Sequence, residues 1–307
     1  MSVPTVADER RHEAGPERLW NESWYLDWFD TDGRTGGYVR LGVCPNLGHA
    51  WFWCALVGQG ELPVLVVDQE TPIPAGPGLE VRSSGLWADL IVEGPLEHFS
   101  VEVEAFGVAL DEPADAYRGM RGERLPVGVD LGWETDGPSE GVEPWAFHYD
   151  FTTRYEIPCR VAGEVRIGDR RITVDGWGQR DHSWAERDWW ATGWTWFSGR
   201  LEDGERFHAV ALEGRDEGIG YRSTPAGLVV EYGVSSTPEL GEMGIPVGGQ
   251  VTLGELSFDL DPVGWAPVLL VDPDDGRLSR FPRGLVAVTT SDGRQGHAWV
   301  EYNQPQA

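Results

Sequence analysis

One stretch of the sequence brings acidic, basic and aromatic side chains unusually close together. It spans residues 176–190 and reads GWGQRDHSWAERDWW. An aspartate held in an apolar pocket has a raised pKa and can donate a proton near neutral pH, and a histidine can serve as acid or base. The residue types therefore predict a proton-transfer site with the catalytic residues Asp181, His182, Asp188 and Arg187.

Side-chain direction limits how these residues can cooperate. Neighbouring side chains of an extended strand point to opposite faces. If residues 180–184 are extended, Asp181 and Ser183 share one face. The other face then carries Arg180, His182 and Trp184. A hydrolase triad on Ser183 is therefore not expected, and the chain has no GxSxG turn for a nucleophile.

A structural interpretation competes with the catalytic one. Arg180 or Arg187 can pair with Asp181 or Asp188 as a clamp, because a buried carboxylate needs a partner. No metal ion is predicted, since the segment holds one histidine and no second histidine lies at ligand spacing. No cofactor is predicted either, because the chain has no P-loop and its GxGxxG-like spacings lack a strand-to-helix context.

Tryptophan is the strongest compositional signal, with 16 residues gathered mainly around positions 20–53 and 177–196. The ordinary interpretation is a packed aromatic core. The alternative is a cavity wall, because many rigid indoles are difficult to pack without voids. Trp190, Trp194 and Trp196 share parity and therefore one strand face. The residues predicted to bind a substrate are Trp177, Trp184, Trp190, Trp194, Trp196, Trp24, Tyr25, Trp51, Trp53 and Glu22.

The turn signals are those of a β-protein. Asp-Gly pairs tolerate the positive φ of tight hairpins, and they occur at 32–33, 136–137, 175–176, 203–204, 275–276 and 292–293, with a Gly-Asp pair at 168–169. Several of them separate runs that alternate in polarity, such as WTWFSGRL and RFHAVALEG. With 41 glycines and 21 prolines, long helices have little room, and helix is predicted only over Ala7–Leu19 and Glu112–Arg121.

A stretch rich in Gly, Pro and acidic residues, Pro126–Pro144, is the predicted boundary between two halves. Strand-like sequence precedes it and resumes after it, which is typical of antiparallel barrels or sandwiches. We therefore predict an all-β fold with few short helices. One β-domain would span residues 1–135, and a second, carrying the RDHSW motif, would span residues 136–307.

The overall composition excludes several classes of function. The formal charge is -27, from 51 acidic and 24 basic residues, and such a chain repels nucleic acid and anionic membranes. Its three cysteines include no CxxC pair, which argues against a disulfide framework or a thiolate zinc site. The first residues lack a secretory apolar core, and no stretch approaches roughly 18 apolar residues, so a cytoplasmic protein without a membrane span is expected.

Three segments carry a resemblance to a known superfamily: GWGQRDHSWAERDWW, NESWYLDWFD and GHAWVEYNQP. They resemble an uncharacterised actinobacterial family that is similar to the hydroxyneurosporene synthase (carotenoid 1,2-hydratase) and AttH-like superfamily. The resemblance implies two lipocalin-like β-barrels side by side, with Asp181 and His182 at a cavity near their junction. Members of this superfamily hydrate or cyclise isoprenoids, and relatives act as pericyclases on polyketide-derived chains.

These observations support three hypotheses of function. The first is a cofactor-independent enzyme that hydrates, isomerises or cyclises a small isoprenoid or polyketide-like substrate after protonation, with indole faces stabilising positive charge. The second is a non-catalytic carrier or sensor for a lipophilic ligand. The third is a carbohydrate-acting protein, since tryptophan platforms and paired carboxylates also suit sugars. A carboxyl with a raised pKa inside a pocket favours the enzyme, whereas a tight Arg–Asp pair outside it favours the carrier.

Overall fold

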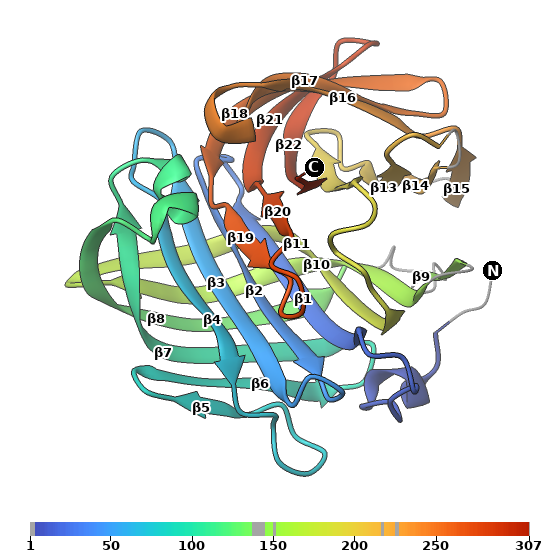
Figure 1. Cartoon of the computed structure of the whole chain (residues 1–307). Coiled ribbons are helices and arrows are strands. Elements are labelled where there is room, and N and C mark those ends of the chain that lie inside the picture. The colour runs from blue at the N-terminus through green and yellow to red at the C-terminus, as the bar shows by residue number, and fades with distance from the viewer. Residues whose placement is uncertain (1–3, 137–144, 150–151, 216–217, 225–226, 307) are drawn as a thin grey trace.

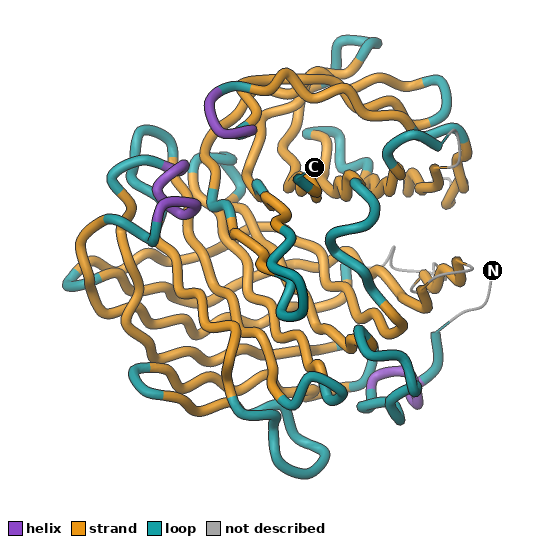
Figure 2. Tube along the Cα trace, viewed as in Figure 1, coloured by secondary structure: helices purple, strands orange, loops and turns teal. Residues whose placement is uncertain are grey.

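The computed structural model describes residues 4–136, 145–149, 152–215, 218–224 and 227–306. Within these ranges the chain forms two large antiparallel sheets with very little helix (Figure 1, Figure 2). The predicted all-β class is therefore confirmed.

The first sheet takes the N-terminal part of the chain and has the order β4-β3-β2-β1-β11-β10-β8-β7-β6-β5, with β9 paired to β10. An additional pairing of β4 with β7 curls this sheet back on itself. Its strands are β1 (Trp20–Asp30), β2 (Thr35–Cys44), β3 (His49–Gly58), β4 (Val64–Thr71), β5 (Val81–Ser83), β6 (Leu86–Gly94), β7 (His98–Leu110), β8 (Gly122–Thr135), β9 (Trp145–Tyr149), β10 (Thr152–Ile167) and β11 (Arg170–Glu186).

The second sheet takes the C-terminal part and has the order β15-β14-β13-β12-β22-β21-β18-β17-β16. The short hairpin β19–β20 joins it through β20 and β22, and Figure 1 shows this hairpin in front of β1 and β2. Its strands are β12 (Trp194–Leu201), β13 (Arg206–Leu212), β14 (Gly218–Thr224), β15 (Gly227–Tyr232), β16 (Ser235–Leu240), β17 (Pro246–Leu253), β18 (Leu256–Trp265), β19 (Val268–Val271), β20 (Leu278–Phe281), β21 (Arg283–Thr290) and β22 (Gln295–Pro305).

Helix in the described residues is limited to 3₁₀ turns at Val6–Glu9, Pro113–Arg118 and Glu242–Gly244. The helical turn predicted within residues 112–121 is confirmed. The helix predicted over residues 7–19 was wrong beyond its first turn. Gly15 and Pro16 explain the difference, because glycine weakens a helix and the residue before a proline is pushed out of helical geometry.

Most of the predicted hairpin turns form, and their glycines at positions 33, 168, 204, 276 and 293 have positive φ. The pair Asp175–Gly176 was wrongly predicted as a turn, since it lies inside β11. Gly176 is needed there for a different reason. A Cβ at this position would overlap the backbone oxygen of Phe29 on the paired strand β1. The pair at 136–137 lies partly outside the described residues.

The predicted linker at residues 126–144 was partly wrong, because β8 extends through Thr135. Its buried Val127, Val129, Leu131 and Trp133 alternate with glycines and acids, and those outward residues hid the strand pattern. Residues 137–144 lie outside the described part. The chain passes from the first sheet to the second between β11 and β12, so residues 152–186 belong to the first sheet. The division into domains at residue 135 stays a prediction.

The buried apolar residues form three clusters. One fills the curl of the first sheet, one lies between the two sheets, and one belongs to the second sheet. All three cysteines are buried and free, as expected for reduced core residues. No helix in the described part of the chain is long and apolar enough to cross a membrane.

Candidate active site between the two sheets

The strand β11 directs two sets of side chains in opposite directions. Arg180 and His182 point into the core of the first sheet, where they lie over the rings of Phe99 and Trp24. Asp181 points the other way, toward the second sheet. This is the division that the sequence pattern predicts for an extended segment.

A small cavity of about 20 Å³ lies between the two sheets, with Asp181 in its wall. That volume is enough for about one water molecule. The residues that line it come from both sheets and from the loop after β11: Ser23, Tyr25, Arg40, Arg154, Asp181, Arg187, Trp189, Trp194, Trp196, Phe281, Arg283 and Glu301. Guanidinium groups and aromatic rings therefore dominate the lining.

Asp181 is buried and forms an ion pair in the cavity wall. The Arg154 guanidinium contacts both its carboxylate and that of Glu156, which stands opposite Asp181 on β10. Burial raises the pKa of Asp181 to about 7, while Arg154 acts to lower it and Glu156 acts to raise it. A carboxyl with such a pKa can both donate and accept a proton near neutral pH.

Glu156 connects this wall to the second sheet. Its carboxylate accepts a hydrogen bond from the Trp196 indole at 3.1 Å and pairs with the His208 ring at 3.2 Å. Gln179 donates to Glu156 and to the Tyr221 hydroxyl, each at 3.1 Å. All five side chains are buried. The polar contacts between the sheets are therefore shielded from water and hold Asp181 in a fixed frame.

A second ion pair, Arg283–Glu301, belongs to the second sheet and also lines the cavity. Arg283 donates from Nε to Glu301 at 2.7 Å, and its guanidinium lies 3.9 Å from the ring centre of Tyr38 and 4.7 Å from that of Tyr25. Burial acts to lower the pKa of Arg283, but Glu301, Tyr38 and Tyr25 together outweigh it and the pKa is raised. This arginine is therefore charged and has a counter-ion.

The residues predicted to bind a substrate divide into groups. Those that line the cavity are Tyr25, Trp194 and Trp196. Those that belong to the apolar cluster between the sheets without lining the cavity are Trp51, Trp53 and Trp190. Those on the opposite face of the first sheet are Trp24, Trp184 and Glu22. Trp177 lies apart, beside a separate small void, with the Arg200 guanidinium 3.7 Å from its ring centre.

The predicted catalytic residues are not all brought together. Asp181 and Arg187 line the cavity, whereas Asp188 is about one-third exposed and lies 3.8 Å from Arg277. The predicted clamp pairs were wrong, because Arg187 donates to a serine and Arg180 pairs with Glu9. Asp181 instead pairs with Arg154.

His182 belongs to a hydrogen-bonded cluster on the face away from the cavity. Its Nε2 lies 3.0 Å from the Glu22 carboxylate, and Nδ1 of His12 lies 2.8 Å from the same oxygen. Burial acts to raise the pKa of Glu22, but the hydrogen bonds from His12 and His182 outweigh it and lower the pKa. His12 was missed at the sequence level because 170 residues separate it from His182.

Two imidazoles and a carboxylate are donors that suit zinc or iron(II), and the three ligand atoms lie within 4.8 Å of one another. A ligating histidine normally has its second nitrogen held by an acceptor. Nδ1 of His182, in contrast, is buried without a hydrogen-bond partner among the described residues. The three groups already satisfy one another, so the cluster is best described as an anchor for the segment before β1.

Several cavity residues were missed at the sequence level. Arg40, Arg154, Arg283 and Glu301 line the cavity, and Glu156 contacts Arg154 behind the lining. Arg40, for example, lies in the largely apolar strand TGGYVRLGVC. A charged residue at a position that the strand alternation buries is the signal that could have found them.

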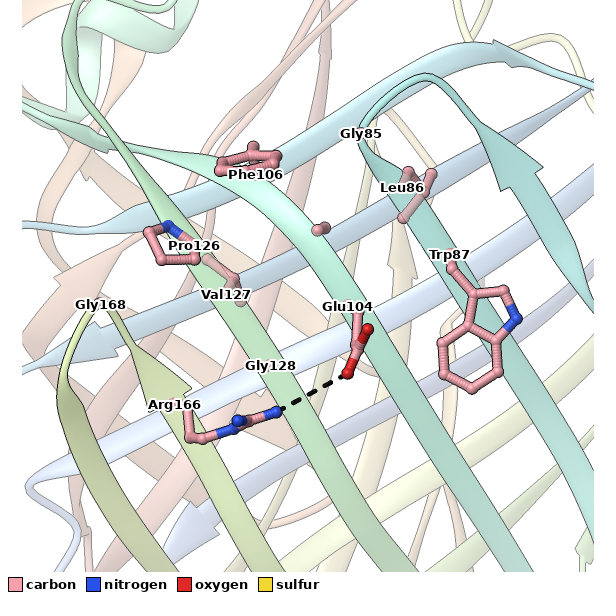
Figure 3. Close-up of a pocket in the computed structure, with 11 residues that line it drawn as sticks. Gly85, Leu86, Trp87, Glu104, Phe106, Pro126, Val127, Gly128, Arg166 and Gly168 are labelled. Carbon is pink, nitrogen blue, oxygen red and sulfur yellow. Dashed lines mark ion pairs between the residues drawn. The ribbon is translucent and has the colours of Figure 1, made fainter.

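A larger hollow lies elsewhere, on an open face formed by β6, β7, β8 and β10 (Figure 3). It measures about 510 Å³. Figure 3 shows Trp87 and Phe106 at its edges and the ion pair of Arg166 with Glu104, at 3.9 Å, across it. Glu104 is the one carboxylate among the described residues that line it. This hollow therefore lacks the pair of carboxyl groups that the carbohydrate hypothesis requires.

The fold and the cavity define a lipocalin-like protein of two β-sheets with a buried polar site between them. Within that class, the chain belongs to the family described as Domain of unknown function (DUF7064), which matches residues 5–306. No curated protein sequence matches the chain.

Several solved structures share the fold. An AttH from Nitrosomonas europaea is 15% identical with a TM-score of 0.63, and the match covers 95% of each chain. CghA is 12% identical with a TM-score of 0.61, over 94% of this chain and 88% of CghA. Kievitone hydratase from Nectria haematococca is 14% identical with a TM-score of 0.59, over 99% of this chain and 96% of the hydratase. The AttH-like fold expected from the sequence resemblance is thereby confirmed.

Proposed function

We propose that this protein is an enzyme that moves a proton onto and off a small hydrophobic substrate in the cavity between the sheets. The proposal depends on one observation, a buried Asp181 carboxyl in the cavity wall whose pKa is raised by burial to about 7. The other aspartate predicted to act as the acid, Asp188, lies nearer to solvent and does not line the cavity. Asp181 is therefore the acid of the proposal.

The chemistry would be hydration, isomerisation or cyclisation. In hydration, one carbon of a C=C bond receives the Asp181 proton and the other receives the oxygen of water. The surplus proton of that water returns to the Asp181 carboxylate, so the residue ends as it began. In isomerisation, the proton delivered at one carbon is balanced by a proton removed at another. A positioned general acid supplies roughly 10²–10⁴-fold of rate.

Substrate entry requires the lining to move. Ligand cavities measure roughly 300–1,000 Å³, far more than the 20 Å³ present here. Arg187 and Trp189, which line one side, belong to the loop between β11 and β12 rather than to a strand. Displacement of this loop would open the cavity without breaking a sheet, as loops that cover active sites do.

The structural neighbours support a substrate of this kind. One crystal structure of CghA contains Sch210972, with a TM-score of 0.61 to this chain, and another neighbour is a hydratase by name. An isoprenoid or polyketide-like substrate is the narrower form of the proposal, and it agrees with the indole-rich lining.

The test compares Asp181→Asn with a matched control on the same strand, Asp175→Asn, whose aspartate is 64% exposed. Each protein is incubated with a metabolite extract in deuterated water, and mass spectrometry follows products that gain water or solvent deuterium at carbon. Asp181→Asn should lose this conversion at least a hundred-fold while its ligand binding is kept and its melting temperature does not fall. The Asp175→Asn control should convert substrates at the original rate. Equal conversion by Asp181→Asn would exclude Asp181 as the acid.

A non-catalytic carrier is the second candidate, because Asp181 is also held in an ion pair by Arg154. A structural pair predicts a different outcome in the same experiment. Asp181→Asn would then lower the melting temperature, since it removes one of the two carboxylates that compensate the buried Arg154, and no protein would convert any compound.

A further inference from the structure

The cavity between the sheets holds more positive than negative charge. Four arginines line it: Arg40, Arg154, Arg187 and Arg283. Two of them pair with the cavity carboxylates, as Arg154 does with Asp181 and Arg283 with Glu301. Arg154 also serves Glu156. Among the described residues, no carboxylate lies within ion-pair distance of the other two arginines.

Arg40 is the clearest case. It is 2% exposed, and its guanidinium donates to the neutral amide oxygen of Asn21 at 3.0 Å. Its Nη1 is buried without a hydrogen-bond partner among the described residues. Burial lowers the pKa of Arg40 to about 9, and the nearby Arg187 and Arg283 act in the same direction. Both the orphaned donor and the lowered pKa show a cation that lacks an anion.

Arg187 repeats the pattern beside the same indole that Arg40 contacts. Its guanidinium donates to the Ser183 hydroxyl at 3.1 Å, which is again a neutral partner. It lies 5.1 Å from the ring centre of Trp189, and Arg40 lies 5.2 Å from the same ring. Burial lowers the pKa of Arg187 to about 10. The two cations therefore lie close to one aromatic side chain at the cavity, and neither is within ion-pair distance of a carboxylate among the described residues.

Burying a charge without a counter-ion is strongly unfavourable, so such groups are rare in the core of a folded protein. Contacts with indole rings return only part of that cost. An anion placed between the two guanidinium groups would return more, because charge-assisted hydrogen bonds are roughly twice as strong as neutral ones. The guanidinium groups of Arg40 and Arg187 are therefore suited to bind a negatively charged ligand.

We propose that Arg40 and Arg187 form a subsite for an oxyanion, a carboxylate or an enolate, carried by the apolar ligand of this cavity. This inference names the substrate class and rests on the proposed function only for the role of Asp181. Aromatic faces at Trp53 and Trp189 are already covered by Arg40. The expectation that indole faces stabilise a developing cation therefore does not suit this site, and charge of the opposite sign is favoured.

A carbonyl conjugated with a C=C bond would be hydrated in two steps. Water adds to the far carbon, and the electron pair of the C=C bond moves onto the carbonyl oxygen, which becomes an enolate held by the two arginines. The Asp181 proton then moves to the carbon next to the carbonyl, which restores the carbonyl. The surplus proton of the added water passes to the Asp181 carboxylate.

The experiment measures binding of two molecules of matched shape, benzoate and benzamide, to the full chain by calorimetry at neutral pH. The original protein should bind benzoate at least ten-fold more tightly than benzamide. Arg40→Met should weaken benzoate binding by roughly ten- to hundred-fold, the worth of a hydrogen bond to a charged group, and leave benzamide unchanged. Arg187→Met serves as the second variant if Arg40→Met does not fold.

The matched control is Arg160→Met, because Arg160 also stacks on a tryptophan, Trp177 at 4.7 Å, but is 42% exposed and outside the cavity. It should bind both molecules as the original protein does. Equal affinity for benzoate and benzamide, or unchanged benzoate binding by Arg40→Met, would overturn the inference. Tighter binding of inorganic phosphate than of benzoate would also overturn it, since a simple anion site would then suffice.

Asp181→Asn separates this inference from the proposed function. If it keeps benzoate binding but loses conversion, both stand. If benzoate is not preferred while Asp181→Asn loses conversion, only the oxyanion subsite fails. If benzoate is preferred while Asp181→Asn converts substrates normally, only the proton-transfer role fails.

Discussion

At the scale of single residues, the protonation state of Asp181 depends on an arginine, Arg154, that contacts two carboxylates. Burial raises its pKa, and Arg154 opposes that rise. Because the same guanidinium also contacts Glu156, neither carboxylate has the cation to itself. An arginine serving Asp181 alone would hold the carboxylate ionised and remove its ability to donate a proton. The shared arrangement leaves it near the midpoint of its titration at neutral pH.

This balance predicts a pH dependence of stability. The pKa of Asp181 is about 7 in the folded protein against 3.8 for the ordinary side chain, so the folded state holds the proton over that interval and the unfolded state does not. The free energy of unfolding should therefore fall as pH rises from about 4 to about 7, by on the order of a few kcal/mol. Urea denaturation at several pH values measures it, and Asp181→Asn should lack this component. A variant with the same pH profile as the original protein would contradict the prediction.

The identity of this residue could be predicted from the sequence, but its environment could not. Asp181 stood out because acids and bases are dense around it within one aromatic segment. Its partner Arg154 lies 27 residues away on a neighbouring strand, and Arg283 comes from the other sheet. Only the register of the strands and the packing of the sheets bring these arginines to the cavity. The spacing of residues along the sequence predicts neither the strand register nor the packing of the sheets.

At the scale of elements, the position of Asp181 depends on how closely β11 approaches β1. The backbone N–H of Gln179 donates to the Asp27 side chain at 2.8 Å. Burial raises the pKa of Asp27 well above its ordinary value. At the adjacent Gly178, a Cβ would overlap the backbone oxygen of Asp27. The absence of a side chain at Gly178 therefore permits the strand contact that aims Asp181 at the cavity.

Gly178→Ala should be destabilising, because the added methyl group meets backbone that cannot move aside as a flexible side chain can. We expect a loss of about 1–3 kcal/mol in the free energy of unfolding, the usual cost of overpacking. Thermal and urea denaturation measure the loss. The matched control is Gly78→Ala, since a Cβ at Gly78 meets no atom within 4 Å. Equal stability of the two variants would show that β11 can shift away from β1 without cost.

Elements were the easiest level to predict where polarity alternates. The strand-like sequence before residue 126 includes the runs 86–94 and 98–110, and both are strands. Alternation of polarity did not reveal strands whose two faces are both buried. In β1, ten consecutive residues are buried, since one face packs inside the first sheet and the other against the second. Such a strand shows no alternation, and its burial follows from packing that is specified elsewhere in the chain.

At the scale of the whole molecule, the apolar cluster between the sheets makes each sheet depend on the other. Trp299 on β22 is fully buried, and its ring centre lies 5.7 Å from that of Tyr38 on β2. Arg283 of the second sheet lies over Tyr38 and Tyr25 of the first. The cavity that holds Asp181 is part of this same interface. Loss of packing anywhere in this interface should therefore destabilise both sheets.

Trp299→Ala tests that dependence. Removing a buried tryptophan should cost about 3–5 kcal/mol, and hydrogen exchange should accelerate at the amides of β1 and β2 as well as of β22. Trp87→Ala is the control, because Trp87 lies on the outer face of β6 and belongs to none of the three apolar clusters. Its effect should be small and confined to β5–β7. If Trp299→Ala accelerates exchange in the second sheet alone, the two sheets are independent folding units. The cavity between them could then open by separation of the sheets, without movement of the loop between β11 and β12.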